Sequence, residues 1–217
     1  NFIIDGKLSA SLKSLGQQNG ATLFMTLLAA LKVLLYRYTG QRDICVGSPI
    51  ANRQQQEVEQ MIGFVVNTLA LRSEISGDVS FTEVLQRVKA TTLEAYEHQD
   101  VPFEKVVDAI VKERDMSRGP LFQVVFALQN NPEAPELRLG ELSLVKEDFE
   151  GTTAKFDITF FIIETSIGLQ ATVQYCTDLY SDQTIERMIL HFQQLLLSIV
   201  KLPLENIDEL SMLSRQE

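Results

Sequence analysis

Residues 22–40 read TLFMTLLAALKVLLYRYTG, the longest strongly apolar stretch with clear ends in the chain. Its apolar side chains occupy nearly every side of a helix, which is typical of a helix buried in the centre of a protein. Thr22 is a favourable N-cap and Gly40 a favourable stop. Residues 43–50 follow as DICVGSPI, a run typical of a buried strand, and its glycine and proline predict a bend where the strand leaves the sheet. The two segments predict a central helix packed on a sheet.

Capping residues further along the chain mark where the other elements begin. Ser80 and Glu83 form a capping box, Ser181 can cap a long amphipathic helix, and Ser9 can cap a first helix that ends at Asn19. Pro102 suits the first turn of another helix. Further helices are predicted over 55–61, 81–98, 103–113 and 182–201, and further strands over 64–72, 122–128, 142–149, 155–164 and 168–176.

The order of these elements indicates the fold class. Helices and strands interleave, but the last strands follow one another directly, and Ile167-Gly168 predicts a tight hairpin between the final two. This order favours an α/β (α+β) two-layer fold, a mixed sheet with helices packed on it, over a doubly wound parallel sheet.

The bulk composition restricts the class of protein. A chain of 217 residues with 45% hydrophobic side chains suits one domain or one lobe, and its net charge of −10 disfavours a nucleic-acid partner. No apolar run reaches the length of a membrane span. Cys45 and Cys176 lie in separate apolar runs, which predicts buried thiols and a cytoplasmic protein. The start at Asn1, without methionine or leader, indicates a fragment of a longer protein.

A search for catalytic patterns finds no self-sufficient machinery. The two histidines, His98 and His191, belong to no HxxxD arrangement, and His191 is interpreted as structural or solvent-facing. GxSxG, Walker, GxGxxG, HExxH and CxxC patterns are absent, and no cluster has metal-ligand spacing. We therefore expect no metal site and no catalytic residue in this chain.

One strand-like segment carries polar residues that need partners. Residues 62–72 read IGFVVNTLALR, and Asn67-Thr68 places an amide and a hydroxyl in an apolar strand. Leaving such groups buried and unpaired costs about 1–3 kcal/mol. They must therefore meet backbone, water or a ligand, and a satisfied pair in the core remains an alternative to a binding role.

Two further segments are polar and specific. Residues 98–104 read HQDVPFE, where Asp100 is predicted to cap the helix that starts at Pro102 and Glu104 favours its positive end. Residues 114–121 read RDMSRGPL, which predicts a loop held by charge-assisted hydrogen bonds. The residues expected to hold that loop, or alternatively to contact a carrier protein, are Arg114, Asp115 and Arg118.

In their order and spacing, these three segments resemble the last three signature motifs of the condensation domains of nonribosomal peptide synthetases, IGxFVNTxxxR, HQDxPFE and RDxSRxPLFQ. Phe64 stands one position away from the pattern of the first motif. Three other segments resemble family segments: residues 46–53, 154–158 with AKFDI, and 175–180, where Cys176 replaces the usual Asn. Several segments in register make a chance match implausible.

One family motif, HHxxxDG, is missing. Its second His and its Asp are central to catalysis, and the family places it in an N-terminal lobe that would precede this sequence. The resemblance implies a chloramphenicol acetyltransferase-like fold, in which two similar lobes form a V around a tunnel. This chain would be the second lobe over residues 1–201, and residues 202–217 would begin a linker toward an adenylation domain.

The resemblance also implies roles for particular residues. Ser48 and Asn67 would face the tunnel and bind substrate, Ser48 through pantetheine or a carbonyl oxygen and Asn67 through an amide. Arg53 and Arg72 would fix loops or meet a carrier phosphate. The remaining residues are expected to be structural: His98, Asp100 and Glu104 in the floor near the tunnel, and Asp157 in the AKFDI segment.

Partners follow from the same resemblance. They would be the N-terminal lobe, donor and acceptor peptidyl carrier domains and an adenylation domain. The carriers would bring phosphopantetheine, so no cofactor would be bound directly. Two alternatives stay open: a lobe used only for carrier docking, or an epimerisation or cyclisation relative of the same fold. The intact HQDVPFE and RDMSRGPL segments favour condensation.

Overall fold

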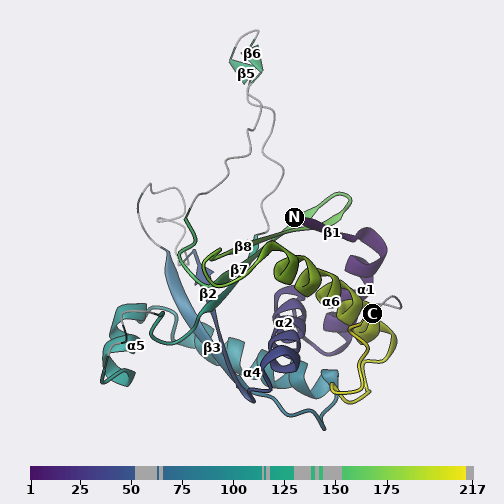
Figure 1. The fold of residues 1–217 in the computed structure, drawn as a ribbon, viewed down its shortest axis with the longest axis horizontal. Coiled ribbons are helices and arrows are strands. Elements are labelled where there is room, and N and C mark those ends of the chain that lie inside the picture. The colour runs from purple at the N-terminus through teal and green to yellow at the C-terminus, as the bar shows by residue number, and fades with distance from the viewer. Residues whose placement is uncertain are drawn as a thin grey trace.

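The computed structural model contains one mixed six-stranded sheet with helices packed on it (Figure 1). Three predictions, for Arg53, for Arg114 and for a helix over 55–61, lie outside the described residues, as does most of the strand predicted over 142–149. The residues that the structure describes are 1–51, 63, 66–113, 115, 118–129, 138–139, 142–143 and 153–213.

The sheet has the strand order β1-β8-β7-β4-β2-β3. Strand β4 runs parallel to both β2 and β7, whereas the other neighbouring pairs are antiparallel. The predicted fold class is therefore confirmed. The strands of this sheet are β1 (Phe2–Asp5), β2 (Asp43–Ile50), β3 (Asn67–Glu74), β4 (Val124–Gln129), β7 (Ile158–Thr165) and β8 (Gly168–Tyr175), and a separate pair comprises β5 (Arg138–Leu139) and β6 (Leu142–Ser143).

Helix α2 lies in the centre of the molecule, as its sequence predicts. Its side chains are buried from Met25 to Leu35, and it packs against three other helices and β2. Figure 1 shows α5 standing apart from the other helices, on the side of β3. The helices are α1 (Gly6–Gln18), α2 (Leu23–Thr39), α4 (Phe81–Glu97), α5 (Phe103–Ile110) and α6 (Asp182–Lys201).

The helix ends confirm most of the predicted caps. Thr22, Ser80 and Ser181 each accept a hydrogen bond from the first turn of their helix, and Gly40 ends α2 with a left-handed φ of 68°. The prediction for Ser9 is wrong. Asp5 caps α1 instead, because β1 runs directly into the helix and places that carboxylate at its first free amides.

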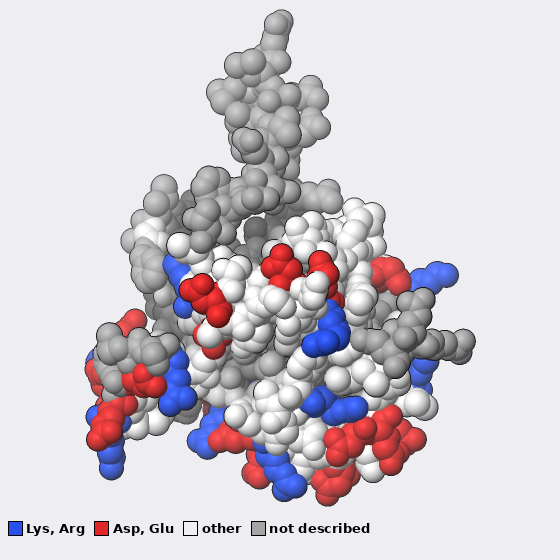
Figure 2. All heavy atoms as spheres, viewed as in Figure 1, with Lys and Arg blue, Asp and Glu red and all other residues white. Residues whose placement is uncertain are grey.

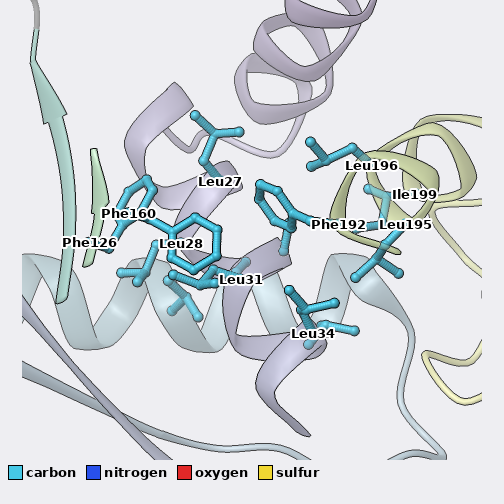
Figure 3. Packing of buried hydrophobic residues seen from close by; sticks show 14 of the residues in the cluster. Leu27, Leu28, Leu31, Leu34, Phe126, Phe160, Phe192, Leu195, Leu196 and Ile199 are labelled. Carbon is cyan, nitrogen blue, oxygen red and sulfur yellow. The ribbon is translucent and has the colours of Figure 1, made fainter. Parts of the chain in front are cut away.

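The core lies between the sheet and helices α2 and α6 (Figure 3). Phe126 and Phe160 project from β4 and β7 toward leucines of α2. Phe192 of α6 packs edge-on against Phe160 with 5.7 Å between ring centroids. One contiguous cluster of buried side chains thus joins the sheet to the helices.

The predicted hairpin between β7 and β8 is confirmed, and it requires glycine at Gly168. Its φ is 138°, a conformation that other residues rarely adopt, and a Cβ there would lie 2.3 Å from the carbonyl oxygen of Ile4. Glycine therefore allows β1 to approach and pair with β8.

The segment after α6 is bonded to α2. Arg37 donates hydrogen bonds to the carbonyl oxygens of Ile207 and Leu210, at 2.8 and 2.9 Å. Ile207 and Leu210 are both buried, so Arg37 binds to residues that pack into the core. The assignment of residues 202–217 to a linker stays a prediction.

Length and apolar composition decide whether a helix can cross a membrane. None of the described helices has enough of both by itself. Taken together, α1 and α2 have the length and the composition, but they bend by 102° at the break between them.

Candidate functional site

Ser48 lies near the end of β2, opposite Leu69 of β3. The strand continues through Pro49 to Ile50 in regular pairing with β3. The bend predicted where it leaves the sheet stays a prediction, because residues 52–62 lie outside the described ones. Ser48 is only 2% exposed. The predicted contact between Ser48 and a substrate therefore stays a prediction. It requires a tunnel for substrate to run along the end of β2.

Asn67, the first residue of β3, uses every hydrogen-bonding position of its side-chain amide. Its Nδ2 donates to the carbonyl oxygens of Gln99, at 2.7 Å, and Val101, at 2.8 Å. Its Oδ1 accepts from the backbone amides of Thr68, at 2.9 Å, and Phe103, at 3.1 Å. An amide side chain offers two donors and two acceptor lone pairs, and all four are occupied here by backbone groups.

The corner between α4 and α5 is therefore held from β3 as well as by its own backbone bonds. Asp100 was predicted to cap α5, and this is wrong: the N-cap position is Pro102, which makes no capping hydrogen bond with its side chain. Asn67 of β3 accepts the amide of Phe103 instead. Glu104 lies in the first turn of α5, as expected, and the exposed His98 closes α4 through its backbone amide.

At the other end of β3, Arg72 pairs with Asp43 across the two strands. Its Nε and Nη2 atoms donate to the two carboxylate oxygens at 2.8 and 2.6 Å. This hydrogen bonding holds the pKa of Asp43 below its usual value and raises the pKa of Arg72. Both side chains are more than half exposed. The two-pronged hydrogen bonding between Arg72 and Asp43 therefore orients the strand ends but adds little to the stability of the fold.

The RDMSRGPL segment contains an ion pair of the predicted kind. The Nε atom of Arg118 lies 3.0 Å from a carboxylate oxygen of Asp115. This contact agrees with a loop held by charge-assisted hydrogen bonds, although Arg114 and Ser117 lie outside the described residues.

A groove of about 700 Å³ opens between α5 and the strand ends that carry Arg72. Asp157 and Tyr180 lie in its wall, and the pKa of Tyr180 is raised by burial and, to a lesser degree, by the negative charge of Asp157. The groove combines an apolar lining with a polar one. The apolar part includes Val106, Ile110, Leu121 and Met188, and the polar part includes Gln41, Asp43, Cys45, Arg72, Gln123, Asp157 and Tyr180.

Apart from the Arg118–Asp115 pair, the described candidate residues fall into two groups. Ser48, Asn67 and the HQDVPFE corner meet where β2 ends and β3 begins. Arg72 and Asp157 lie at the groove, beside the opposite ends of the strands. Helix α5 connects the two groups, because its first residue bonds to Asn67 and its last turns line the groove.

Sequence reasoning missed a stack of aromatic rings beside β2. Phe122 lies between Phe103 and Phe156, with ring centroids 5.4 and 5.8 Å away. Its ring covers Gly47 so closely that a Cβ on the glycine would lie 2.2 Å from it. A glycine inside a strand was the available signal, since it often marks the close approach of another group.

Replacing Gly47 by alanine is expected to lower the free energy of unfolding by about 1–3 kcal/mol, because the added methyl group must displace the buried Phe122 ring. Urea unfolding of the domain measures the loss. In a Gly47→Ala, Phe122→Leu double variant the ring is gone, so the two losses should not add. Fully additive losses would contradict the contact.

The two histidines lie in different surroundings. His191 is buried, and its Nδ1 atom lies 2.7 Å from the hydroxyl of Tyr38, which confirms a structural histidine. His98 is exposed at a helix end. Within the described part of the chain, no three His, Cys, Asp or Glu side chains are placed to hold a metal ion.

Figure 2 shows one face of the molecule by charge. Acidic side chains gather at its lower right, whereas lysines and arginines stand singly or beside acidic groups. This face is consistent with the net charge of −10.

Comparisons with known proteins agree on one family. The family model of the condensation domain matches residues 1–217. A linear gramicidin synthase protein from Brevibacillus parabrevis is 51% identical over 96% of this chain, and bacitracin synthase 3 from Bacillus licheniformis is 43% identical over all of it. The chain spans only 3% of the length of each of these two relatives.

Solved structures show the same architecture. A four-domain nonribosomal peptide synthetase bound to AMP and glycine has a TM-score of 0.92 at 26% identity, covering 99% of this chain and 17% of that one. The X-domain from teicoplanin biosynthesis has a TM-score of 0.88 at 25% identity, covering 96% of this chain and 48% of that one. The first condensation domain of the CDA synthetase shares the fold, with a TM-score of 0.78 at 19% identity over 98% of this chain and 47% of that one.

Proposed function

Because this chain belongs to the condensation-domain family, we propose that it is the C-terminal lobe of a domain that forms amide bonds in nonribosomal peptide synthesis. One observation carries the proposal. The chain matches the family along its whole length, yet it covers only 48% of the X-domain chain and 47% of the CDA condensation-domain chain. A companion lobe of similar size would supply the HHxxxDG motif that this sequence lacks.

The proposed reaction joins two carrier-bound thioesters. The amine of an aminoacyl thioester attacks the carbonyl carbon of an acyl or peptidyl thioester, the new C–N bond replaces the C–S bond, and the amine proton is transferred as the thiol leaves. Holding both tethered reactants in line removes much of the entropic cost of their encounter. The histidine of the companion lobe would orient or deprotonate the amine, and hydrogen-bond donors would stabilise the oxyanion.

In this proposal the chain supplies one wall of the reaction passage. Ser48 and Asn67 lie within two strand positions of each other, where β2 ends and β3 begins. Ser48 is the candidate for a contact with pantetheine or the thioester carbonyl. The saturated amide of Asn67 favours a structural role over the substrate contact expected from the sequence.

The proposed partners follow from the same assignment. They are the N-terminal lobe, the donor and acceptor carrier domains and an adjacent adenylation domain. Phosphopantetheine would arrive on the carriers, and a cytoplasmic location fits this assembly. No cofactor would be held by the chain itself.

The expected result is that the isolated chain forms no dipeptidyl product from loaded carrier proteins, whereas the domain that includes the upstream lobe does. The reason is that the proton-handling histidine lies outside this chain. Mass spectrometry of the carrier-bound thioesters measures the product. Product from the isolated chain, or none from the complete domain, would contradict the proposal.

A second candidate is an interaction lobe without chemistry. The observation that favours it is a solved complex of the X-domain and OxyB from teicoplanin biosynthesis, which matches this chain with a TM-score of 0.86 at 26% identity, over 97% of this chain and 47% of that one. The same assay separates the candidates, because a complete domain that binds loaded carriers but never forms product supports the second.

A further inference from the structure

Helix α5 is short and lies largely at the surface. It is eight residues long, and Val107 is its one residue buried from solvent. Ile110, on the same apolar stripe, is 63% exposed. No side chain of its own segment caps it, so the amide of Phe103 bonds to Asn67, which is 36 residues earlier in the chain.

Asn67 holds both sides of the turn that leads into α5. Its Nδ2 donates to Gln99 and Val101 before the helix, and its Oδ1 accepts from Phe103 inside it. The turn is also tied to α4, because the amide of Val101 donates to the carbonyl oxygen of His98. One side chain of β3 therefore bonds to both sides of the turn between α4 and α5.

The turn that Asn67 holds is connected through side-chain contacts to the candidate site. The Phe103 ring packs on Phe122, and Phe122 covers Gly47, the residue before Ser48. In the other direction, Val106 and Ile110 of α5 line the groove beside Arg72. A shift of α5 would move both the ring stack beside β2 and one wall of the groove.

We propose that Asn67 is a positioning residue that clamps the α4–α5 corner to β3, and thereby sets the ring stack next to Ser48 and the α5 wall of the groove. This inference rests on the proposed condensation function for its effect on rate. The clamp itself rests only on the four hydrogen bonds of Asn67 and the missing cap of α5.

The test compares Asn67→Ala with Asp100→Ala in the complete domain that contains this chain. Asp100 is the matched control because it lies in the same corner, is exposed and does not cap α5. Hydrogen–deuterium exchange of the Phe103 amide should become about tenfold faster in Asn67→Ala and stay within about twofold in Asp100→Ala.

Kinetics with loaded carriers provide the functional readout. In Asn67→Ala, kcat should fall about tenfold or more while KM for either carrier stays within about twofold, since a small misplacement of the site slows the reaction without removing a substrate contact. If Asn67→Ala does not fold, Asn67→Ser is used, because its hydroxyl can still accept from Thr68 within β3 but is too short to reach the corner.

Each other outcome overturns the inference. A slower reaction with unchanged exchange at Phe103 would assign Asn67 a direct contact with substrate. Faster exchange of the Phe103 amide with an unchanged kcat would show that Asn67 holds the corner but does not position the site for the reaction. If the wild-type domain forms no product, the proposed function fails, while the exchange measurement alone still supports or overturns the clamp.

Discussion

Replacing Phe192 by alanine is expected to lower the free energy of unfolding by about 3–5 kcal/mol. Phe192 is fully buried on α6, where the apolar faces of the sheet, α2 and α6 meet (Figure 3). Its ring lies edge-on to Phe2 and Phe160, at centroid distances of 6.4 and 5.7 Å. Alanine would leave a cavity there and remove two aromatic pairs, each of which contributes about 0.5–1.5 kcal/mol.

This loss is large because a domain is typically stable by only about 5–15 kcal/mol. Urea unfolding of the complete domain, followed by circular dichroism, measures it. Leu190→Ala is the matched control: Leu190 lies two residues earlier on the same helix and is 58% exposed, so the change should stay within about 0.5 kcal/mol. Equal losses in the two variants would contradict the packing described for Phe192.

The second large effect concerns Lys32, a fully buried lysine in the middle of α2. Its Nζ atom donates to the carbonyl oxygen of Leu71 at 2.8 Å and to the hydroxyl of Ser73 at 2.7 Å, both on β3. Desolvation lowers the pKa of Lys32 from 10.5 to about 8, against smaller opposite effects from Cys45 and Asp43. Lys32 thus satisfies a carbonyl on the last strand of the sheet while burying a charge.

The depressed pKa makes stability depend on pH in a defined direction. Below about pH 8, both the folded and the unfolded chain hold the proton, so the penalty for burying the charge is fully present. Between about pH 8 and 10.5 only the unfolded chain still binds it, and stability rises with pH. The difference between the two pKa values corresponds to about 3 kcal/mol over the whole interval.

Lys32→Met tests this dependence because it keeps an unbranched side chain without a titrating group. The unfolding free energy of the wild type, minus that of Lys32→Met, should rise by about 2–3 kcal/mol between about pH 7.5 and 10. Taking the difference removes the pH dependence of the groups that Lys32 does not influence. Parallel curves for the two proteins would show that Lys32 is not buried as a charge.

Local patterns in the sequence predicted most of the regular structure. The apolar run of α2, with Thr22 and Gly40 at its ends, identified a central helix with its correct boundaries. The capping box at Ser80 and the turn at Gly168 were equally readable. These features depend on residues within a few positions of one another, so their physical causes lie entirely inside short windows of sequence.

The candidate site was less accessible to the same reasoning. Asp100 lies at the sequence position expected for a residue that caps α5. The amide of Phe103, at the start of that helix, bonds to Asn67 of β3 instead. The polar pair at Asn67-Thr68 was recognised as needing partners, and for Asn67 those partners are backbone groups up to 36 residues away. Spacing along the chain contains no information about which distant carbonyl will face a given amide.

The order of the residues alone determined the helices, the strands, their caps and the family motifs. Side-chain periodicity and capping chemistry act over one or two turns, so a short window of sequence is enough to predict them. Folding alone determined that Asn67 meets the α4–α5 corner, that Phe122 covers Gly47 and that Lys32 reaches Leu71. Each of these contacts joins residues far apart in the chain, and such pairs are chosen by how the sheet and helices pack as a whole.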